Sequence, residues 1–259
     1  PTQNRIADIL STYDDLIENN NRRITLLEQA AQALYKEWFV RFRFPGCENT
    51  KFENGLPSQW ARVRFGSIID IIDGDRGTNY PKQEDFLCSG YCVFLNTGNV
   101  TKNGFNFSSI NYISKEKDLS LRKGKLSRND VVLTTRGTIG NSAFYNQYVP
   151  FENIRINSGM VILRGKTGIF QEYIYCLLNS EHWQKSILLY ASGSAQPQLP
   201  IKDMRRIKIV KPDSSTLVAF TSITKKYYDE IALLSSKNQT LRKQQELLLP
   251  RLASGKLDV

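Results

Sequence analysis

Two segments, one at each end of the chain, carry the same heptad pattern. In the first, the seam residues are spaced alternately by four and three positions, as in a coiled coil: Ile6, Leu10, Tyr13, Ile17, Asn20, Ile24, Leu27, Ala31, Leu34 and Trp38. Adding 214 to each number gives a second series with the same spacing: Phe220, Thr224, Tyr227, Ile231, Leu234, Asn238, Leu241, Gln245, Leu248 and Leu252. The local sequences also match, IADILSTYDDLI against FTSITKKYYDEI. The pattern predicts two long helices that pair along these seams.

The alternative is that each helix packs separately on a globular core, as most amphipathic helices do. The polar seam residues favour pairing instead. With full antiparallel overlap, Ile6 faces Leu252 and Asn20 faces Asn238, whereas a parallel pair would place Asn20 against Leu234. An asparagine pair in an apolar seam fixes the register, because a slip buries each amide without its partner. We therefore expect an antiparallel pair.

Antiparallel pairing brings the end of the first helix beside the start of the second. The middle of the chain must then form a globular domain at one end of the paired helices. We expect an α+β fold of three parts: an N-terminal helix over residues 1–46, a mixed α/β domain with its linker over 47–210, and a C-terminal helix over 211–259. Pro250 is expected to end or bend the second helix.

The middle region changes to short β-rich runs separated by Gly, Asn, Ser and Thr. The expected strands cover residues 63–72, 92–96, 130–135, 158–164 and 207–210, and one helix is expected over 171–190. These elements predict a mixed α/β domain with polar loops.

Charge points to the class of partner. The 259 residues carry Lys+Arg 35 against Asp+Glu 25, a net charge of +10. This balance favours a polyanion such as nucleic acid. No apolar run reaches the roughly 20 residues that span a bilayer, and the chain does not open on a signal-peptide pattern. We expect a soluble, cytoplasmic protein with no membrane partner.

Motifs for catalysis or cofactor binding are missing from the sequence. The single histidine, His182, lies inside the expected helix, and no Ser or Cys has a nucleophile context. No phosphate-binding or dinucleotide-binding glycine motif occurs. Cys88 and Cys92 lack a nearby histidine to complete a zinc site, so we expect reduced thiols, no metal and no cofactor. Acidic residues such as Asp73 and Asp75 are expected to be solvated.

The loops of the middle region predict a DNA-binding surface. Arg matches guanine and Asn or Gln matches adenine through two hydrogen bonds, while Lys, Ser, Thr and backbone N–H groups suit phosphates. For each residue taken alone, an ordinary turn contact is an equally good explanation. The candidates are Arg76, Asn79, Tyr80, Lys82, Asn96, Asn99, Lys102, Thr135, Arg136, Thr138, Arg155, Asn157, Ser192, Ser194, Gln196 and Gln198.

Several stretches resemble the specificity subunit of type I DNA restriction-modification enzymes. The N-terminal helix is similar to the family's spacer helix, and LPSQWARVRFG at 56–66 to the start of a target recognition domain. DVVLTTRGTIG at 130–140 and SGSAQPQLP at 192–200 resemble stretches inside such a domain. LRKQQELLLPRLASGKLDV at 241–259 resembles the family's C-terminal end.

The resemblance implies a non-catalytic subunit that reads one half of a bipartite double-stranded DNA target. Its helices would dock methyltransferase subunits and, through them, the restriction subunit. The family alternates recognition domain and helix twice, whereas this chain has helix, domain, helix. It therefore carries a single recognition domain and could pair with a second specificity chain or with itself. The alternatives are a decoy or inhibitory fragment, and an adaptor whose domain binds protein.

Overall fold

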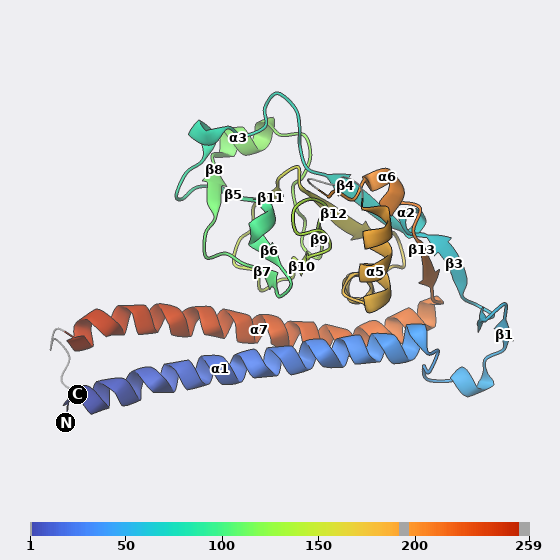
Figure 1. The fold of residues 1–259 in the computed structure, drawn as a ribbon, viewed down its shortest axis with the longest axis horizontal. Helices are drawn as coiled ribbons and strands as arrows, with labels where there is room; N and C mark the ends of the chain where they lie inside the picture. The colour runs from blue at the N-terminus through green and yellow to red at the C-terminus, as the bar shows by residue number, and fades with distance from the viewer. Residues whose placement is uncertain (1, 192–196, 254–259) are drawn as a thin grey trace. The chain divides into compact units, whose positions relative to one another are not determined.

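The computed structural model describes residues 2–191 and 197–253 (Figure 1). The chain divides into two compact units. The first, which we call the helical unit, comprises Pro1–Ala31 and Thr224–Val259; the second, the globular unit, comprises Gln32–Ile223. Two long helices and a mixed β domain confirm the expected α+β class.

The α-helices are α1 (Thr2–Tyr35), α2 (Phe65–Ile68), α3 (Lys115–Ser120), α4 (Gln171–Leu178), α5 (Glu181–Tyr190), α6 (Ile201–Met204) and α7 (Ser214–Ala253). The strands are β1 (Phe52–Glu53), β2 (Leu56–Pro57), β3 (Ala61–Arg64), β4 (Ile69–Asp73), β5 (Cys92–Leu95), β6 (Val100–Thr101), β7 (Gly104–Phe105), β8 (Asn111–Ile113), β9 (Val131–Thr134), β10 (Ser142–Phe144), β11 (Ile154–Ile156), β12 (Met160–Gly165) and β13 (Lys208–Lys211). A π-helical turn, η1 (Lys36–Val40), directly follows α1. None of the helices in the described part of the chain has the length and apolar character to span a bilayer.

In the helical unit, α1 and α7 lie side by side and run in opposite directions (Figure 1). A polar layer joins them: Asn20 Nδ2 donates to Asn238 Oδ1 at 2.8 Å, and Asn238 Nδ2 donates to Asn21 Oδ1 at 2.9 Å. Asn238 is 6% exposed, so this layer lies inside the seam. The observed pairing is antiparallel, in the register that places Asn20 opposite Asn238.

The seam positions are buried or half-buried along both helices. Ile17, Ala31, Leu234 and Leu252 are among the buried ones, with at most 9% of each residue exposed. The helix α7 includes Pro250 and is described as far as Ala253, so Pro250 does not end it. The proline removes one N–H from the hydrogen bonds of the last turns.

The ends of the two helices that belong to the globular unit meet in an aromatic cluster. The Phe39 ring lies 4.8 Å from Phe220, 5.1 Å from Tyr173 and 5.6 Å from Trp60, centroid to centroid. Offset and edge-to-face ring pairs each add to the stabilisation that comes from burial. The cluster connects η1, α4, α7 and the chain that leads into β3.

The core of the globular unit lies between two sheets. The four-stranded sheet has the order β10-β9-β12-β4 with antiparallel neighbours, and the three-stranded sheet has the order β11-β5-β8. Val93 and Ile154 of the smaller sheet pack with Val132 and Ile162 of the larger one. Every residue of β9 is buried, as expected for a strand covered on both faces.

Two expected elements are each interrupted. The run 63–72 is not one strand, because the helical turn α2 separates β3 from β4. The run 171–190 is two helices, α4 and α5. Ser180 separates them: its Oγ accepts a hydrogen bond from the backbone N–H of Trp183 and so caps α5. Periodicity alone did not reveal this cap.

Asp213 joins the chain that leads into β3 to the start of α7. Its carboxylate accepts hydrogen bonds from the Thr216 backbone N–H at 3.0 Å and from Trp60 Nε1 at 2.8 Å. It therefore caps the N-terminus of α7 and binds the residue that precedes β3. Burial opposes ionisation, but the hydrogen bonds from Ser215, Thr216 and Trp60 outweigh it and lower the pKa of Asp213 to about 2.

The polar layer gives a test of the helix register. Asn238→Leu should lower the free energy of unfolding by about 1 kcal/mol, because it leaves the half-buried amide of Asn20 without its partner, whereas the exposed Asn21 remains hydrated. Replacing Asn20 and Asn238 together with leucine should restore or exceed the parent's stability, because both partners of the hydrogen bond in the seam are then removed. Urea denaturation measures both effects. A double variant less stable than the single one would contradict this account.

Asp213 makes part of the stability depend on pH. Its folded pKa of about 2 lies below the ordinary value of 3.8, so its contribution is present above about pH 5 and is lost as the pH falls towards 2. Asp213→Asn should therefore reduce the loss of stability on acidification, as measured by urea denaturation across this range. The exposed Asp15→Asn serves as the control. Equal acid dependence in parent and Asp213→Asn would refute the assignment.

Candidate functional site

The segment 135–136 of the globular unit lies between two other loops and binds both of them. On one side it binds the carbonyl of Gly159. This oxygen accepts hydrogen bonds from the backbone N–H groups of Thr135 and Arg136 at 2.8 and 3.2 Å, and from Thr135 Oγ1 at 3.0 Å. The same stretch pairs on its other side with the chain after α5, where Leu199 N–H donates to the Thr135 carbonyl at 2.9 Å and Arg136 bridges Gln198.

The loop after β4 contacts residues 157 and 158, which precede Gly159. Arg76 Nη2 donates to Asp73 Oδ1 and to the Ser158 carbonyl, both at 3.2 Å. A Cβ atom at Gly74 would lie 2.2 Å from the Asn157 carbonyl oxygen, so only glycine permits this approach.

A fifth loop follows β5. Asn157 N–H donates to the Leu95 carbonyl at 3.0 Å, and a Cβ atom at Gly159 would lie 2.7 Å from Thr97 Cγ2. We call the five segments 74–77, 96–98, 135–138, 157–159 and 198–199 the loop cluster. It exposes the side chains of Arg76, Arg136 and Gln198 together on one unit.

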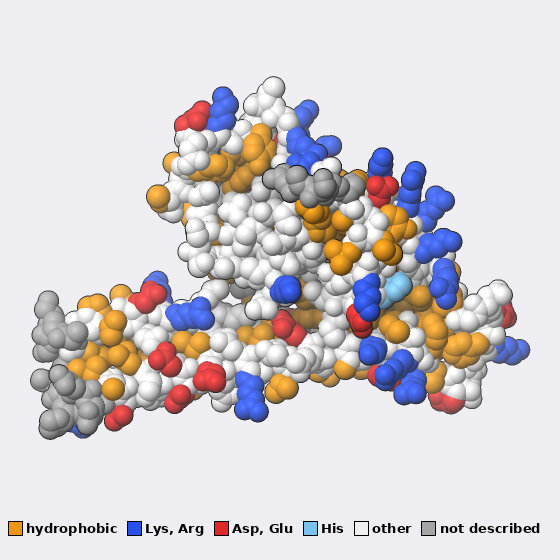
Figure 2. Space-filling view, viewed as in Figure 1, with side chains coloured by type: hydrophobic (Ala, Val, Ile, Leu, Met, Phe, Trp, Pro, Cys, Tyr) orange, Lys and Arg blue, Asp and Glu red, His pale blue; other side chains and the backbone are white. Residues whose placement is uncertain are grey.

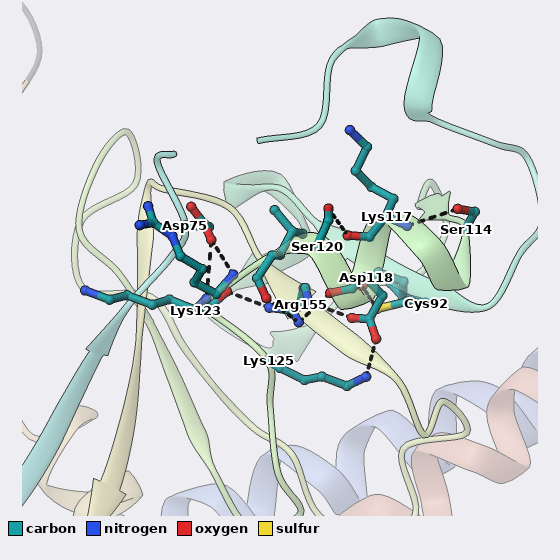
Figure 3. A network of polar contacts seen from close by, with 12 residues as sticks. Asp75, Cys92, Ser114, Lys117, Asp118, Ser120, Lys123, Lys125 and Arg155 are labelled. Atoms are coloured by element: carbon teal, nitrogen blue, oxygen red, sulfur yellow. Dashed lines mark hydrogen bonds and ion pairs between the residues drawn. The ribbon is translucent and has the colours of Figure 1, made fainter. Parts of the chain in front are cut away.

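A buried aspartate holds the Arg76 loop in place. Asp75 is 4% exposed, and its carboxylate accepts hydrogen bonds from the backbone N–H groups of Gly77 at 2.7 Å and Arg122 at 2.6 Å (Figure 3). Burial raises its pKa, but these bonds, together with that from Lys123, lower it below the ordinary value. The expectation that this acidic loop is solvated is therefore wrong for Asp75.

Arg155 lies beneath the loop cluster. It is 6% exposed, and its Nε donates to Asp118 Oδ1 at 2.6 Å (Figure 3). Its Nη atoms donate to the carbonyls of Lys123, Asp118 and Leu121. Lys125 also pairs with Asp118, and the bonds from Lys125 and Arg155 lower the pKa of this carboxyl although burial opposes them. Arg155 is thus buried, with its donors bound to Asp118 and to three backbone carbonyls.

Other candidates also shape the loops. Asn99 is 4% exposed and donates to the carbonyls of Asn106 and Ser109. Asn157 Oδ1 accepts the Gly159 N–H at 2.9 Å, and Tyr80 packs edge-on against Phe94. These contacts define loop conformation.

The remaining candidates differ in position. Asn79 is exposed but donates to the Ser120 carbonyl at 3.1 Å, and Asn96 caps its own turn by accepting the Gly98 N–H. Lys82, Lys102 and Thr138 are exposed, Lys102 in the β6–β7 turn. Ser192, Ser194 and Gln196 lie outside the described residues.

The buried thiol of Cys92 lies beside the Asp118 carboxylate. Burial, with the Asp118 carboxylate beside it, raises the pKa of Cys92 to about 12, so this thiol is protonated at neutral pH. The four cysteines are free thiols. Within residues 2–191 and 197–253, no group of three or more His, Cys, Asp or Glu side chains is placed to hold a metal ion.

Comparisons with known proteins agree on one family. The family model described as "Type I restriction modification DNA specificity domain" matches residues 57–243. The chain is 28% identical over 264 residues to the MjaIX specificity subunit of Methanocaldococcus jannaschii, covering 99% of this chain and 59% of that protein. It is 22% identical over 308 residues to the HindI specificity subunit of Haemophilus influenzae, covering 99% and 67%.

Solved structures share the fold. The S subunit of a type I restriction-modification system from M. genitalium superposes with a TM-score of 0.55 at 17% identity, covering 94% of this chain and 60% of that one. The HsdS subunit from Thermoanaerobacter tengcongensis gives 0.52 at 17% identity, covering 99% and 58%. The chain thus spans about three-fifths of these structures and of the M. jannaschii relative.

The buried ion pair gives a test of the site's construction. Arg155→Met should lower the free energy of unfolding by about 3–5 kcal/mol, because it removes one of the two basic partners of the buried Asp118 and leaves three backbone carbonyls without their donor. Arg62→Met, at an exposed arginine of the same unit, should change it by less than about 0.5 kcal/mol. Urea denaturation distinguishes them; equal effects would show that Arg155 does not support the loops.

Proposed function

The chain belongs to the type I restriction modification DNA specificity family, and we propose that it reads one half of a two-part DNA target. The observation that carries the proposal is the loop cluster, which gathers Arg76, Arg136 and Gln198 on one rigid unit. Sequence is read at base edges by arginine and amide side chains, so this set has the chemistry for the task.

Arg76 presents an exposed guanidinium in a fixed position. Its Nη2 makes both bonds that fix the side chain, to Asp73 and to Ser158, which leaves Nε and Nη1, on opposite edges of the group, as single donors to a base or phosphate oxygen. The neighbouring Asp75 accepts the Gly77 N–H and ties this loop to the backbone of Arg122. A guanidinium held in advance loses less conformational entropy when it binds a base.

Arg136 combines a fixed backbone with an exposed side chain. Its N–H donates to Gly159, and it bridges Gln198, so the two residues lie beside each other. Arginine pairs with O6 and N7 of guanine, and glutamine with N6 and N7 of adenine. Adjacent Arg136 and Gln198 could therefore read neighbouring base pairs.

The paired helices supply the second part of the proposed function. A polar layer that permits one register gives them a defined length and relative position. We assign to them the spacing between this reader and a second one, and the docking of methyltransferase subunits. Those subunits would carry the methylation chemistry, and through them a restriction subunit would join the complex.

A second reader is required for a two-part target. The chain matches about three-fifths of the M. jannaschii specificity subunit and has one domain flanked by two helices. The second reader would come from another specificity chain, a second copy of this one, or a further domain of a longer protein.

Arg136→Ala tests the reading role. It should weaken binding to the preferred duplex by about 5- to 150-fold, because a good arginine–base pair contributes about 1–3 kcal/mol of discrimination. Binding to a scrambled duplex should change little. Fluorescence anisotropy at constant salt measures both, with a preferred duplex enriched from a random pool by the parent protein. The control is Arg22→Ala, at an exposed residue of α1.

An unchanged preference in Arg136→Ala would refute the role of this residue. Parent protein that enriches no sequence would refute the proposed function itself, and binding to methyltransferase without sequence preference would point to a decoy.

A further inference from the structure

A second surface of the globular unit is strongly basic. It consists of exposed residues on α6, β13, β3 and the turn between α6 and β13, and we call it the basic face: Arg62, Arg64, Lys202, Arg205, Arg206 and Lys208. Figure 2 shows Lys and Arg side chains in a row along this edge of the unit, where Figure 1 places α6, β13 and β3.

Two of these charges face each other directly. The strands β3 and β13 pair antiparallel, with Lys208 opposite Arg64 and Val210 opposite Arg62. Residues directly opposite on an antiparallel pair lie on the same face, and like charges there destabilise the pair. The inward positions Val63 and Ile209 are half-buried and buried, so the basic residues occupy the outer face.

Little negative charge balances this face. Among the described residues, Arg62, Arg64, Lys202 and Lys208 form no ion pair within 4.0 Å. Arg206 approaches Asp203 only at 3.9 Å. An arrangement that repels itself in the free protein is stabilised when an anion lies across it.

The basic face continues from the loop cluster along the chain. Gln198 and Leu199 of the cluster are followed at once by α6. Arg205, just after α6, donates from Nη2 to the Ile71 carbonyl of β4 at 3.4 Å, and β4 ends at Asp73, which orients Arg76. The face and the cluster are therefore linked through shared elements of one unit.

We propose that the basic face binds the phosphate backbone of duplex DNA next to the base pairs read by the loop cluster. The proposal rests on the proposed function and adds a sequence-independent contact to it. Phosphates are bound by Lys and Arg without regard to sequence, and such contacts set orientation and affinity. An acidic protein partner is less suitable, because the core of a protein interface relies on buried aromatic or apolar anchors, and the six residues of this face are all charged.

The test compares two double variants that each remove two positive charges. Arg64→Gln with Lys208→Gln changes the basic face, whereas Lys51→Gln with Lys237→Gln changes exposed residues elsewhere. The affinity of the full chain is measured over a range of salt concentrations for a random-sequence duplex and for the preferred duplex enriched by the parent protein.

In the face variant, the plot of log K against log salt should become shallower by about 0.9 for each phosphate that the protein no longer neutralises, or about 2 in all. Both duplexes should bind more weakly by the same factor, so the preference between them is kept. The control should keep the parent's slope. The face variant should also melt at or above the parent's temperature, because a repulsive pair has been removed.

A parent-like slope in the face variant would overturn the proposal, and so would weaker binding confined to the preferred duplex, which would mean base reading. A lower melting temperature would contradict the repulsion between Arg64 and Lys208. Each of these results leaves the proposed function standing, whereas absence of any sequence preference in the parent refutes the proposed function alone.

Discussion

The loop cluster depends on one carbonyl group, that of Gly159. Two backbone N–H groups and a hydroxyl from 135–136 converge on it, and a side chain at position 159 would collide with Thr97. Gly159 directly precedes β12, and residue 135 directly follows β9. Because these two strands are neighbours in the buried sheet, the sheet sets the position of this carbonyl. Loops that are polar and exposed are thereby given defined positions, which a surface that discriminates between ligands requires.

Buried charge completes this support. Asp75 binds the Gly77 N–H of its own loop and the backbone N–H groups of Arg122 and Lys123. Arg155 in β11 binds the Lys123 carbonyl and Asp118, so it joins β11 to the same segment. Each carboxylate keeps its charge because donors surround it, so the network is stabilising only while it is complete. The buried carboxylates of Asp75 and Asp118 bind backbone and basic groups of the unit itself, whereas the side chains of Arg76 and Arg136 are exposed to solvent.

The sequence predicted the helices better than the site. A heptad seam is a local pattern, and the asparagines that fix the register belong to it, so Asn20 and Asn238 could be matched before any coordinates. Arg155 looked like a surface residue because its neutralising partner, Asp118, is distant in the chain and no periodicity connects them. The prediction of a single strand over 63–72 was wrong because the helical turn α2 interrupts it. The order of the strands in the sheets brings the five loops together, and the spacing of residues along the sequence does not reveal that order.

The central claim is that this chain gives sequence specificity to DNA modification. Genome-wide mapping of DNA methylation in the source cell, with and without the gene, is the most direct test. We expect deletion of the gene to remove methylation at one two-part motif and to leave methylation at other motifs unchanged. Restoring the gene should restore methylation at that motif. An identical methylation map in both strains would contradict the account.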